Sequence, residues 1–294
     1  MLYSPLYGNI KFDEPLSRHT SIKAGGRARI WIEPESTQQL CRIVSDAGKN
    51  KIPVFTIGAG CNIIAKPGNI EKVFVRLNAP VFKNIEFKAC YAVAGAGALL
   101  NNFFKAAMAR SLGGYEFLSG IPGTVGGAVF GNAGTKNNDI CDLLEEAEVI
   151  DRAGVIKKIK KQNIGFGYRK SGLGNYIITS AKFKFERRDK KETEALLKEN
   201  FAIKKQKQDY AAPSAGCIFK NPKNFHLSAG EMIDKCGLKG RSFNGAQISS
   251  RHANFIINKH NARAEDIIFL TKLIKYKVKK AYGINLEEEV KIIS

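Results

Sequence analysis

The sequence predicts an α+β protein of two or three domains, in which several strands end in glycine-rich turns. Its 294 residues are too many for one small core. Segments with the alternating or continuous hydrophobic character of strands are interspersed with segments of helical periodicity. One stretch stands out, residues 116–134 (EFLSGIPGTVGGAVFGNAG), because it holds more glycine and alanine than an ordinary core element needs.

A first lobe is expected over residues 1–78. A strand ends at Pro34, and Ser36 is placed to cap the helix that follows, whose apolar residues share one face. The next strand is short and buried, and it runs into the turn GAGCN at 58–62. Strands are predicted at 28–34, 54–58 and 72–77, and a helix at 37–50.

A second lobe is expected over 79–190 and a third region over 200–283, with the C-terminal strand 284–294 joining the first lobe. Alternation and helical periodicity define their elements. For the second lobe the strands are 90–97, 147–151, 155–160 and 175–186, and the helix is 98–110. A charged helix over 190–208 leads to the third region, where helices 229–237 and 264–281, strands near 246–249 and 254–258, and the terminal strand LEEEVKII follow.

The charge and the cysteines restrict the class of protein. The net charge of +20 is compatible with a nucleic acid, a membrane surface or an anionic small molecule as partner. The lysines are spread over faces of predicted helices and strands, without a basic arm or an aromatic RNA-binding signature, so nucleic acid is disfavoured. The six cysteines show no CxxC spacing, which argues against zinc and fits reduced thiols in the cytoplasm.

No apolar run reaches the roughly 18 residues of a membrane span. The N-terminus also lacks the basic and then apolar pattern of a signal peptide. Both observations predict a cytoplasmic protein without a membrane partner. We expect a monomer.

The stretch 116–134 predicts a site for a phosphate-containing ligand. Glycines allow positive φ and a close approach of the backbone to a ligand, and Pro122 fixes a turn. Thr124 is placed to cap a short helix over 125–129, whose N-terminus would attract an anion. The structural alternative is a tightly packed helix of small residues.

The spacing of the glycines excludes the common nucleotide-binding motifs. Two other turns, GAGCNI (58–63) and GAGALL (95–100), lack the third glycine of GxGxxG, and no GxxxxGK is present. Three separate glycine-rich turns are more than one phosphate needs. A long dinucleotide, with its pyrophosphate in a cleft between lobes, could use all of them.

Seven segments occur in an order that resembles the UDP-N-acetylenolpyruvoylglucosamine reductase (MurB) family, in its shorter type II form. They are TIGAGCNII, GGYEFLSGIPGTVGGAVFGNAG, FGYRKSG, PSAGCIFKNP, AGEMIDKCGLKG, GAQISSRHANFIIN and LEEEV. The resemblance extends from about residue 17 to 290. It implies a three-domain flavoenzyme, with a two-lobed FAD-binding fold of the vanillyl-alcohol-oxidase (PCMH) type and a substrate-binding domain.

The resemblance also implies FAD as cofactor and NADPH as reductant. The four histidines lie outside the three glycine turns, so a histidyl link to FAD in those turns is impossible, and non-covalent binding is expected. A serine is usual where Cys61 stands, and the change matters little if the contact is through the backbone. The residues that match the cofactor-binding pattern are Gly58, Gly60, Cys61, Asn62, Ser119, Gly120, Thr124, Gly127 and Asn132.

The implied reaction reduces the enolpyruvyl ether of UDP-N-acetylglucosamine to UDP-N-acetylmuramate. Hydride passes from NADPH to FAD and then from flavin N5 to the substrate, and a proton completes the lactyl group. Arg169 matches the family's arginine, whose guanidinium suits the substrate carboxylate. Cys217 matches the proton donor, where most members have serine, and Glu289 matches the family's glutamate. Taken alone, these three residues would be a surface arginine, a small buried cysteine and a solvated acid.

Three further residues match substrate-binding positions. Lys207 corresponds to a diphosphate contact, Asn221 to the carboxylate side, and Gln247 to the sugar or uridine. Asp209 replaces a common proline close to Lys207, which leaves the local alignment open. The remaining alternatives are another FAD-dependent oxidase of the same fold and a basic nucleic-acid-binding protein.

Overall fold

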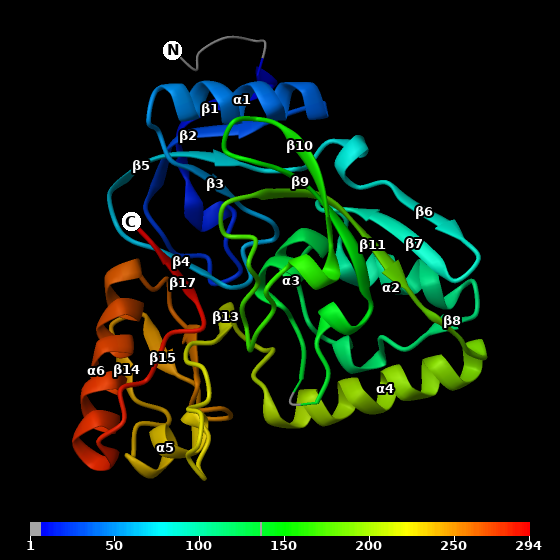
Figure 1. Ribbon diagram of the computed structural model, residues 1–294. Coiled ribbons are helices and arrows are strands. Elements are labelled where there is room, and N and C mark those ends of the chain that lie inside the picture. The colour runs from blue at the N-terminus through cyan, green and yellow to red at the C-terminus, as the bar shows by residue number, and fades with distance from the viewer. Residues whose placement is uncertain (1–6, 136) are drawn as a thin grey trace. The chain divides into compact units, whose positions relative to one another are not determined.

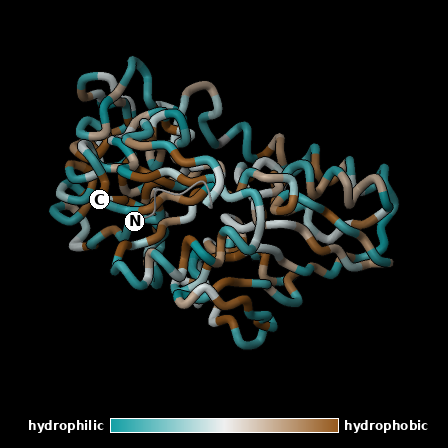
Figure 2. The backbone as a smooth tube through the Cα atoms, turned by 90° about the horizontal axis from the view of Figure 1, so that it is seen from above, coloured by the Kyte–Doolittle hydropathy of each residue, from teal (hydrophilic) through white to brown (hydrophobic). Residues whose placement is uncertain are grey.

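The computed structural model describes residues 7–135 and 137–294, which form two compact units. The first unit comprises Met1–Phe12, Arg29–Ala59 and Glu71–Ile203, and the second comprises Asp13–Ala28, Gly60–Ile70 and Lys204–Ser294. Each unit has its own cluster of buried hydrophobic side chains. In Figure 2, hydrophilic residues occupy many of the outer turns of the backbone.

Two sheets organise the first unit. A four-stranded sheet has the order β1-β2-β5-β3, and β3 pairs in parallel with β5, Val54 opposite Val73. A five-stranded antiparallel sheet has the order β10-β9-β11-β7-β6 (Figure 1). The strands are β1 (Asn9–Pro15), β2 (Arg27–Glu33), β3 (Val54–Thr56), β5 (Asn69–Val75), β6 (Ile85–Lys88), β7 (Tyr91–Gly95), β9 (Leu144–Ile150), β10 (Ile156–Lys160) and β11 (Ile177–Lys184), with the short pair β8 (Leu112–Gly113) and β12 (Glu186–Arg187) beside them.

The helices α1, α2 and α3 of the first unit each bury apolar residues. In α1 (Thr37–Lys49), Ser36 accepts a hydrogen bond from the Gln39 N–H, which confirms the predicted cap. In α2 (Leu100–Met108), Phe103 stacks with or tilts against rings of the antiparallel sheet region, including Phe87 and Phe183. The remaining helices are α3 (Val125–Gly131), which contacts β11 and β7, and α4 (Lys190–Lys207), which continues into the second unit.

The second unit contains a four-stranded antiparallel sheet with two helices and a separate parallel strand pair. The sheet order is β13-β16-β15-β14, and β17 pairs in parallel with β4, Lys291 opposite Ile63. Ile267, Leu270 and Ile274 form the buried face of the long helix α6. The elements are β4 (Ile63–Ala65), β13 (Ser214–Cys217), α5 (Ala229–Lys235), β14 (Ser242–Phe243), β15 (Ala246–Ile248), β16 (Phe255–Asn258), α6 (Ala264–Tyr282) and β17 (Lys291–Ile293).

Two predicted strands differ from the observed ones. The expected buried strand 54–58 is β3, which ends at Thr56 and is only half-buried, because it lies at the edge of its sheet. The expected strand LEEEVKII is reduced to β17, Lys291–Ile293. In an alternating strand Glu288 and Ile293 would lie on opposite faces, with Glu288 on the apolar face. Instead, Ile293 is buried, whereas Glu288 is half-exposed and paired with Lys275.

Phe103→Ala tests the aromatic core of the first unit. Phe103 is fully buried and contacts several rings, so truncation leaves a cavity that lowers the free energy of unfolding by about 3–5 kcal/mol. Denaturant or thermal unfolding of the purified protein measures the loss. Phe201→Ala is the matched control, because Phe201 is 41% exposed in the same unit. Equal effects of the two substitutions would contradict the assigned core.

Candidate functional site

The stretch 116–134 folds as predicted around Thr124. The Thr124 hydroxyl accepts a hydrogen bond from the Gly127 N–H at 3.3 Å, and α3 begins at Val125. Upstream, the Ser119 hydroxyl donates to the Leu197 carbonyl at 2.9 Å. Gly120 and Gly123 have φ of 73° and 136°, the region where only glycine is free of strain. The bare backbone before α3 is therefore held in place by bonds within the first unit.

The N-terminus of α3 does not form the expected anion site. The Val125 N–H donates to Ala98 O and the Gly126 N–H to Ala96 O, both at 2.9 Å. The Gly127 N–H bonds to Thr124. Since the first three N–H groups of the helix have partners within the protein, they are not offered to a phosphate, and the expectation for this helix was wrong.

The turn that follows β3 starts against Thr124. A Cβ added to Gly58 would lie 2.5 Å from the Thr124 Oγ1, closer than real Cβ contacts allow. Only glycine therefore lets these two glycine-rich segments meet. By contrast, a Cβ at Gly123 or Gly131 would meet no protein atom within 4 Å, so space is open beside the backbone there. Meeting glycine segments with open space beside them fit an extended cofactor such as FAD.

The second part of the turn is held by a residue that the sequence analysis missed. Ser21 donates its N–H to Gly60 O at 3.1 Å, and its hydroxyl lies 3.2 Å from that oxygen and 2.6 Å from Ser214 O. Gly60 has φ of 66°. Burial raises the pKa of the neighbouring Cys61 thiol, while a hydrogen bond from Ser21 lowers it. Ser21 is neither a glycine nor a charged residue, so no pattern in the sequence pointed to it.

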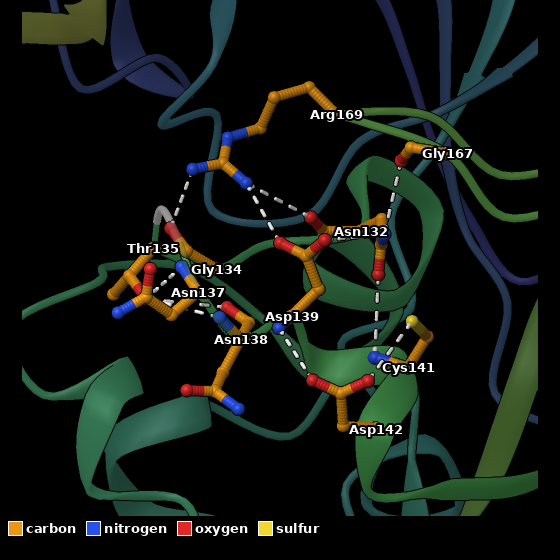
Figure 3. A network of polar contacts seen from close by, with 10 residues as sticks. All are labelled: Asn132, Gly134, Thr135, Asn137, Asn138, Asp139, Cys141, Asp142, Gly167 and Arg169. Carbon is orange, nitrogen blue, oxygen red and sulfur yellow. Dashed lines mark hydrogen bonds and ion pairs between the residues drawn. The ribbon is translucent and has the colours of Figure 1, made fainter.

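Arg169 lies in a polar network of the first unit (Figure 3). Its Nη1 donates to Asp139 Oδ1 at 3.1 Å and to Asn132 O at 3.4 Å, and its Nη2 donates to Gly134 O at 2.6 Å. The guanidinium also lies 5.0 Å from the centre of the Tyr168 ring. The arginine is thus fixed to the end of the glycine-rich stretch rather than extended into solvent.

The side chain of Asn132 is enclosed by protein. It is 1% exposed, and φ of 45° places it at the left-handed C-cap of α3. Its amide nitrogen donates to Asp139 Oδ2 at 3.2 Å and Gly167 O at 3.1 Å, and its oxygen accepts from the Cys141 N–H at 3.3 Å. In the structure the Asn132 side chain joins three segments, and its contact with FAD stays a prediction.

Cys217 and Glu289 lie on neighbouring segments of the second unit. Cys217 ends β13, and the carbonyl of the next residue, Ile218, accepts the Glu289 N–H at 2.8 Å. Asn62 joins the same region, because its Nδ2 donates to Glu289 O at 3.2 Å and its carbonyl accepts the Lys291 N–H at 2.9 Å. Three predicted site residues from distant parts of the sequence are therefore brought together.

The three acids of LEEEV differ in their surroundings. Glu287 pairs with Lys220 at 2.6 Å, and its side chain is 73% exposed. Glu288 pairs with Lys275 of α6 at 2.7 Å. Neither ion pair could be predicted from the sequence. Glu289 differs from both acids, because its N–H donates to the carbonyl next to Cys217 and its carbonyl accepts from Asn62.

The predicted substrate-binding residues have structural bonds of their own. Asn221 Oδ1 accepts the Ala229 N–H at the start of α5, at 3.1 Å. Gln247 Nε2 donates to Gly240 O at 2.9 Å and Ser242 Oγ at 3.0 Å. Lys207 ends α4, but its side chain lies outside the described part of the structure. The substrate contacts of all three remain predictions.

Among residues 7–135 and 137–294, no group of His, Cys, Asp and Glu is arranged to hold a metal ion. In the same ranges, no helix has the length and apolar character needed to cross a bilayer.

Two family models match the chain. Residues 28–160 match an FAD binding domain, and residues 207–293 match the C-terminal domain of UDP-N-acetylenolpyruvoylglucosamine reductase. Curated relatives of the same name agree. The protein from Listeria welshimeri is 40% identical over 97% of this chain and 95% of its own, and one from Clostridium botulinum is 38% identical over 100% and 96%.

Solved structures show the same relationship. The UDP-N-acetylenolpyruvylglucosamine reductase (MurB) of Thermus caldophilus is 32% identical, with a TM-score of 0.83 over 97% of this chain and 98% of that one. The 6-hydroxy-D-nicotine oxidase of Arthrobacter nicotinovorans is 15% identical, with a TM-score of 0.50 over 64% of this chain, and shares the fold alone. The α+β fold of the FAD-binding PCMH type predicted from the sequence is confirmed.

Gly58→Ala tests the contact between the two glycine-rich segments. Its Cβ would overlap Thr124, so the segments must separate, and such overpacking lowers stability by about 1–3 kcal/mol. We expect a lower Tm and loss of bound flavin on gel filtration. Gly174→Ala is the matched control, since a Cβ there meets nothing within 4 Å and Gly174 lies outside both segments. A Gly58→Ala protein with wild-type Tm and flavin content would contradict the contact.

Proposed function

The chain belongs to the UDP-N-acetylenolpyruvoylglucosamine reductase family, and we propose that Arg169, Cys217 and Glu289 carry out that activity here. The protein reduces the enolpyruvyl ether of UDP-N-acetylglucosamine to UDP-N-acetylmuramate with NADPH, a step of peptidoglycan precursor synthesis. When bound, FAD would supply the hydride transfer, from NADPH to the substrate.

The cofactor is held by backbone more than by side chains. The turn 58–62 and the bare backbone at Gly120 and Gly123 are the surfaces where glycine is required or leaves open space, which supports their contact with FAD. Ser119 and Thr124 hold this backbone in place through their hydroxyl groups. Cys61 substitutes for a serine at little cost, because the turn depends on Ser21 and the glycines.

Arg169 binds the substrate carboxylate. When hydride reaches the terminal methylene carbon, negative charge develops on the neighbouring carbon and spreads into that carboxylate. A guanidinium held by three oxygen acceptors needs little reorganisation to stabilise the charge, and such preorganised groups are worth several kcal/mol in enzymes, about 2.7–4 for one donor.

Cys217 donates the proton that completes the lactyl group. A thiol has a reference pKa of about 8.5, so it is a stronger acid than the serine hydroxyl usual in the family. Glu289 supports the enol form from the adjoining segment. The bond between the Glu289 N–H and Ile218 O, next to Cys217, is the observation that supports this pairing most directly.

Several finer features complete the proposal. Lys207 binds the diphosphate, Asn221 the carboxylate side and Gln247 the sugar or uridine.

The domains are 1–78 with 284–294, 79–190, and 200–283, the last binding the sugar nucleotide. The protein works in the cytoplasm as a monomer without a membrane or nucleic-acid partner. Light scattering tests the monomer, and binding assays with vesicles and duplex DNA test the absence of these partners.

The activity is tested with purified protein and its spectrum. We expect a yellow preparation with a flavin spectrum that consumes NADPH only when the enolpyruvyl substrate is added. Product analysis should show UDP-N-acetylmuramate. A colourless protein that takes up no flavin on reconstitution would refute the proposal, and peroxide formation from an alcohol or lactone would assign it to the oxidases instead.

Cys217→Ala separates the two half-reactions. Reduction of the flavin by NADPH should stay within about threefold of wild type, while reoxidation by the substrate should slow by about 10²–10⁴-fold, the usual contribution of a positioned acid. Stopped-flow absorbance of the flavin measures both rates. Cys217→Ser is the matched control and should retain reoxidation. Equal losses of both half-reactions in Cys217→Ala would mean that this cysteine is structural.

A further inference from the structure

The carboxylate of Asp139 forms an ion pair with Arg169, and the pair is well shielded from solvent. The Asp139 Oδ1 lies 3.1 Å from Arg169 Nη1, with side-chain exposures of 26% and 17%. Figure 3 shows the carboxylate between the guanidinium and the Asn132 amide. Because Asn132 Nδ2 donates to the second oxygen, Oδ2, the carboxylate is fixed at both oxygens.

The backbone around Arg169 needs such an anchor. Gly167 and Lys170 exchange both N–H···O bonds, so Tyr168 and Arg169 form the tip of a tight turn. Arg169 has φ of 54°, a conformation that non-glycine residues adopt only when their surroundings enforce it. Asn132 Nδ2 also donates to Gly167 O, which ties the base of this turn to the end of α3.

The position of Asp139 is set independently of the arginine. Its N–H donates to Asp142 Oδ2 at 2.9 Å, and the two residues form a capping box on the short helix η5 (Ile140–Asp142). Gly134 leaves room for the carboxylate, because a Cβ there would overlap the Asp139 Oδ1. The carboxylate is therefore placed by its own segment before the guanidinium meets it.

We propose that Asp139 is a positioning residue, which holds the Arg169 guanidinium in the orientation that receives the substrate carboxylate. The inference rests on the proposed role of Arg169. Asp139 does not contact substrate in this proposal but acts through the arginine. Its charge also balances that of Arg169 before substrate binds, so the guanidinium is already oriented when the substrate carboxylate arrives.

The kinetic test compares Asp139→Ala with Asp142→Ala. Asp142→Ala removes the side-chain bond to the Asp139 N–H, but it keeps the Asp142 N–H that the Asp139 carboxylate accepts and every bond to Arg169, so it controls for local folding. In Asp139→Ala we expect reoxidation of the reduced flavin by substrate to slow by about 10–100-fold, since small misplacements of catalytic groups have effects of this size. Reduction by NADPH and flavin content should match wild type in both variants.

A double-mutant comparison shows whether Asp139 acts through Arg169. In the Arg169→Lys background, Asp139→Ala should slow reoxidation little further, because the fork that it orients is gone. If Asp142→Ala slows reoxidation as much as Asp139→Ala, or if Asp139→Ala has its full effect in the Arg169→Lys background, the proposal is wrong.

An NMR measurement without substrate separates this proposal from the proposed function. The Arg169 Nη–H signals, identified by their loss in Arg169→Lys, should exchange with water several-fold faster in Asp139→Ala than in wild type or Asp142→Ala, because Nη1 donates to Asp139. Unchanged exchange in Asp139→Ala would overturn the positioning role. If wild-type flavin is not reoxidised by the enolpyruvyl substrate, the proposed function fails, and this exchange rate still decides whether Asp139 holds Arg169.

Discussion

The hydrogen bonds of one buried amide, that of Asn132, connect the glycine-rich stretch 116–134 to the turn that carries Arg169, the residue proposed to bind the substrate carboxylate. Its two donors and its acceptor bind the turn at Gly167, the carboxylate of Asp139 and the Cys141 N–H. An unsatisfied buried amide is costly, so each partner constrains the other two. The end of α3, the segment from Asp139 to Cys141 and the Arg169 turn therefore behave as one rigid element.

The sequence predicted most regular elements because their signals are local. Ser36 and Thr124 cap the helices that follow them, as their residue types indicate, and the buried faces of α1 and α2 match the helical period. The errors fell where tertiary contacts decide. Edge position left β3 half-buried, and ion pairs with lysines interrupted the apparent alternation of the C-terminal segment.

The sequence motifs indicated candidate site residues but not the contacts around them. Ordered motifs indicated Arg169, Cys217 and Glu289, whose roles stay predictions. Nothing in those motifs indicated that residues before α3 accept its first N–H groups, that Ser21 holds the turn at Gly60, or that Asp139 pairs with Arg169. These are long-range contacts between residues of ordinary type, which single-sequence patterns do not record.

The left-handed conformation of Arg169 places stability and catalysis in opposition at one residue. Glycine or asparagine would adopt this φ with less strain, and either would make the turn between Gly167 and Lys170 easier to form. Both would remove the guanidinium. Selection for heat resistance alone would therefore favour a replacement that removes the proposed carboxylate-binding group, so that a gain in stability at this turn would come with a loss of the proposed activity.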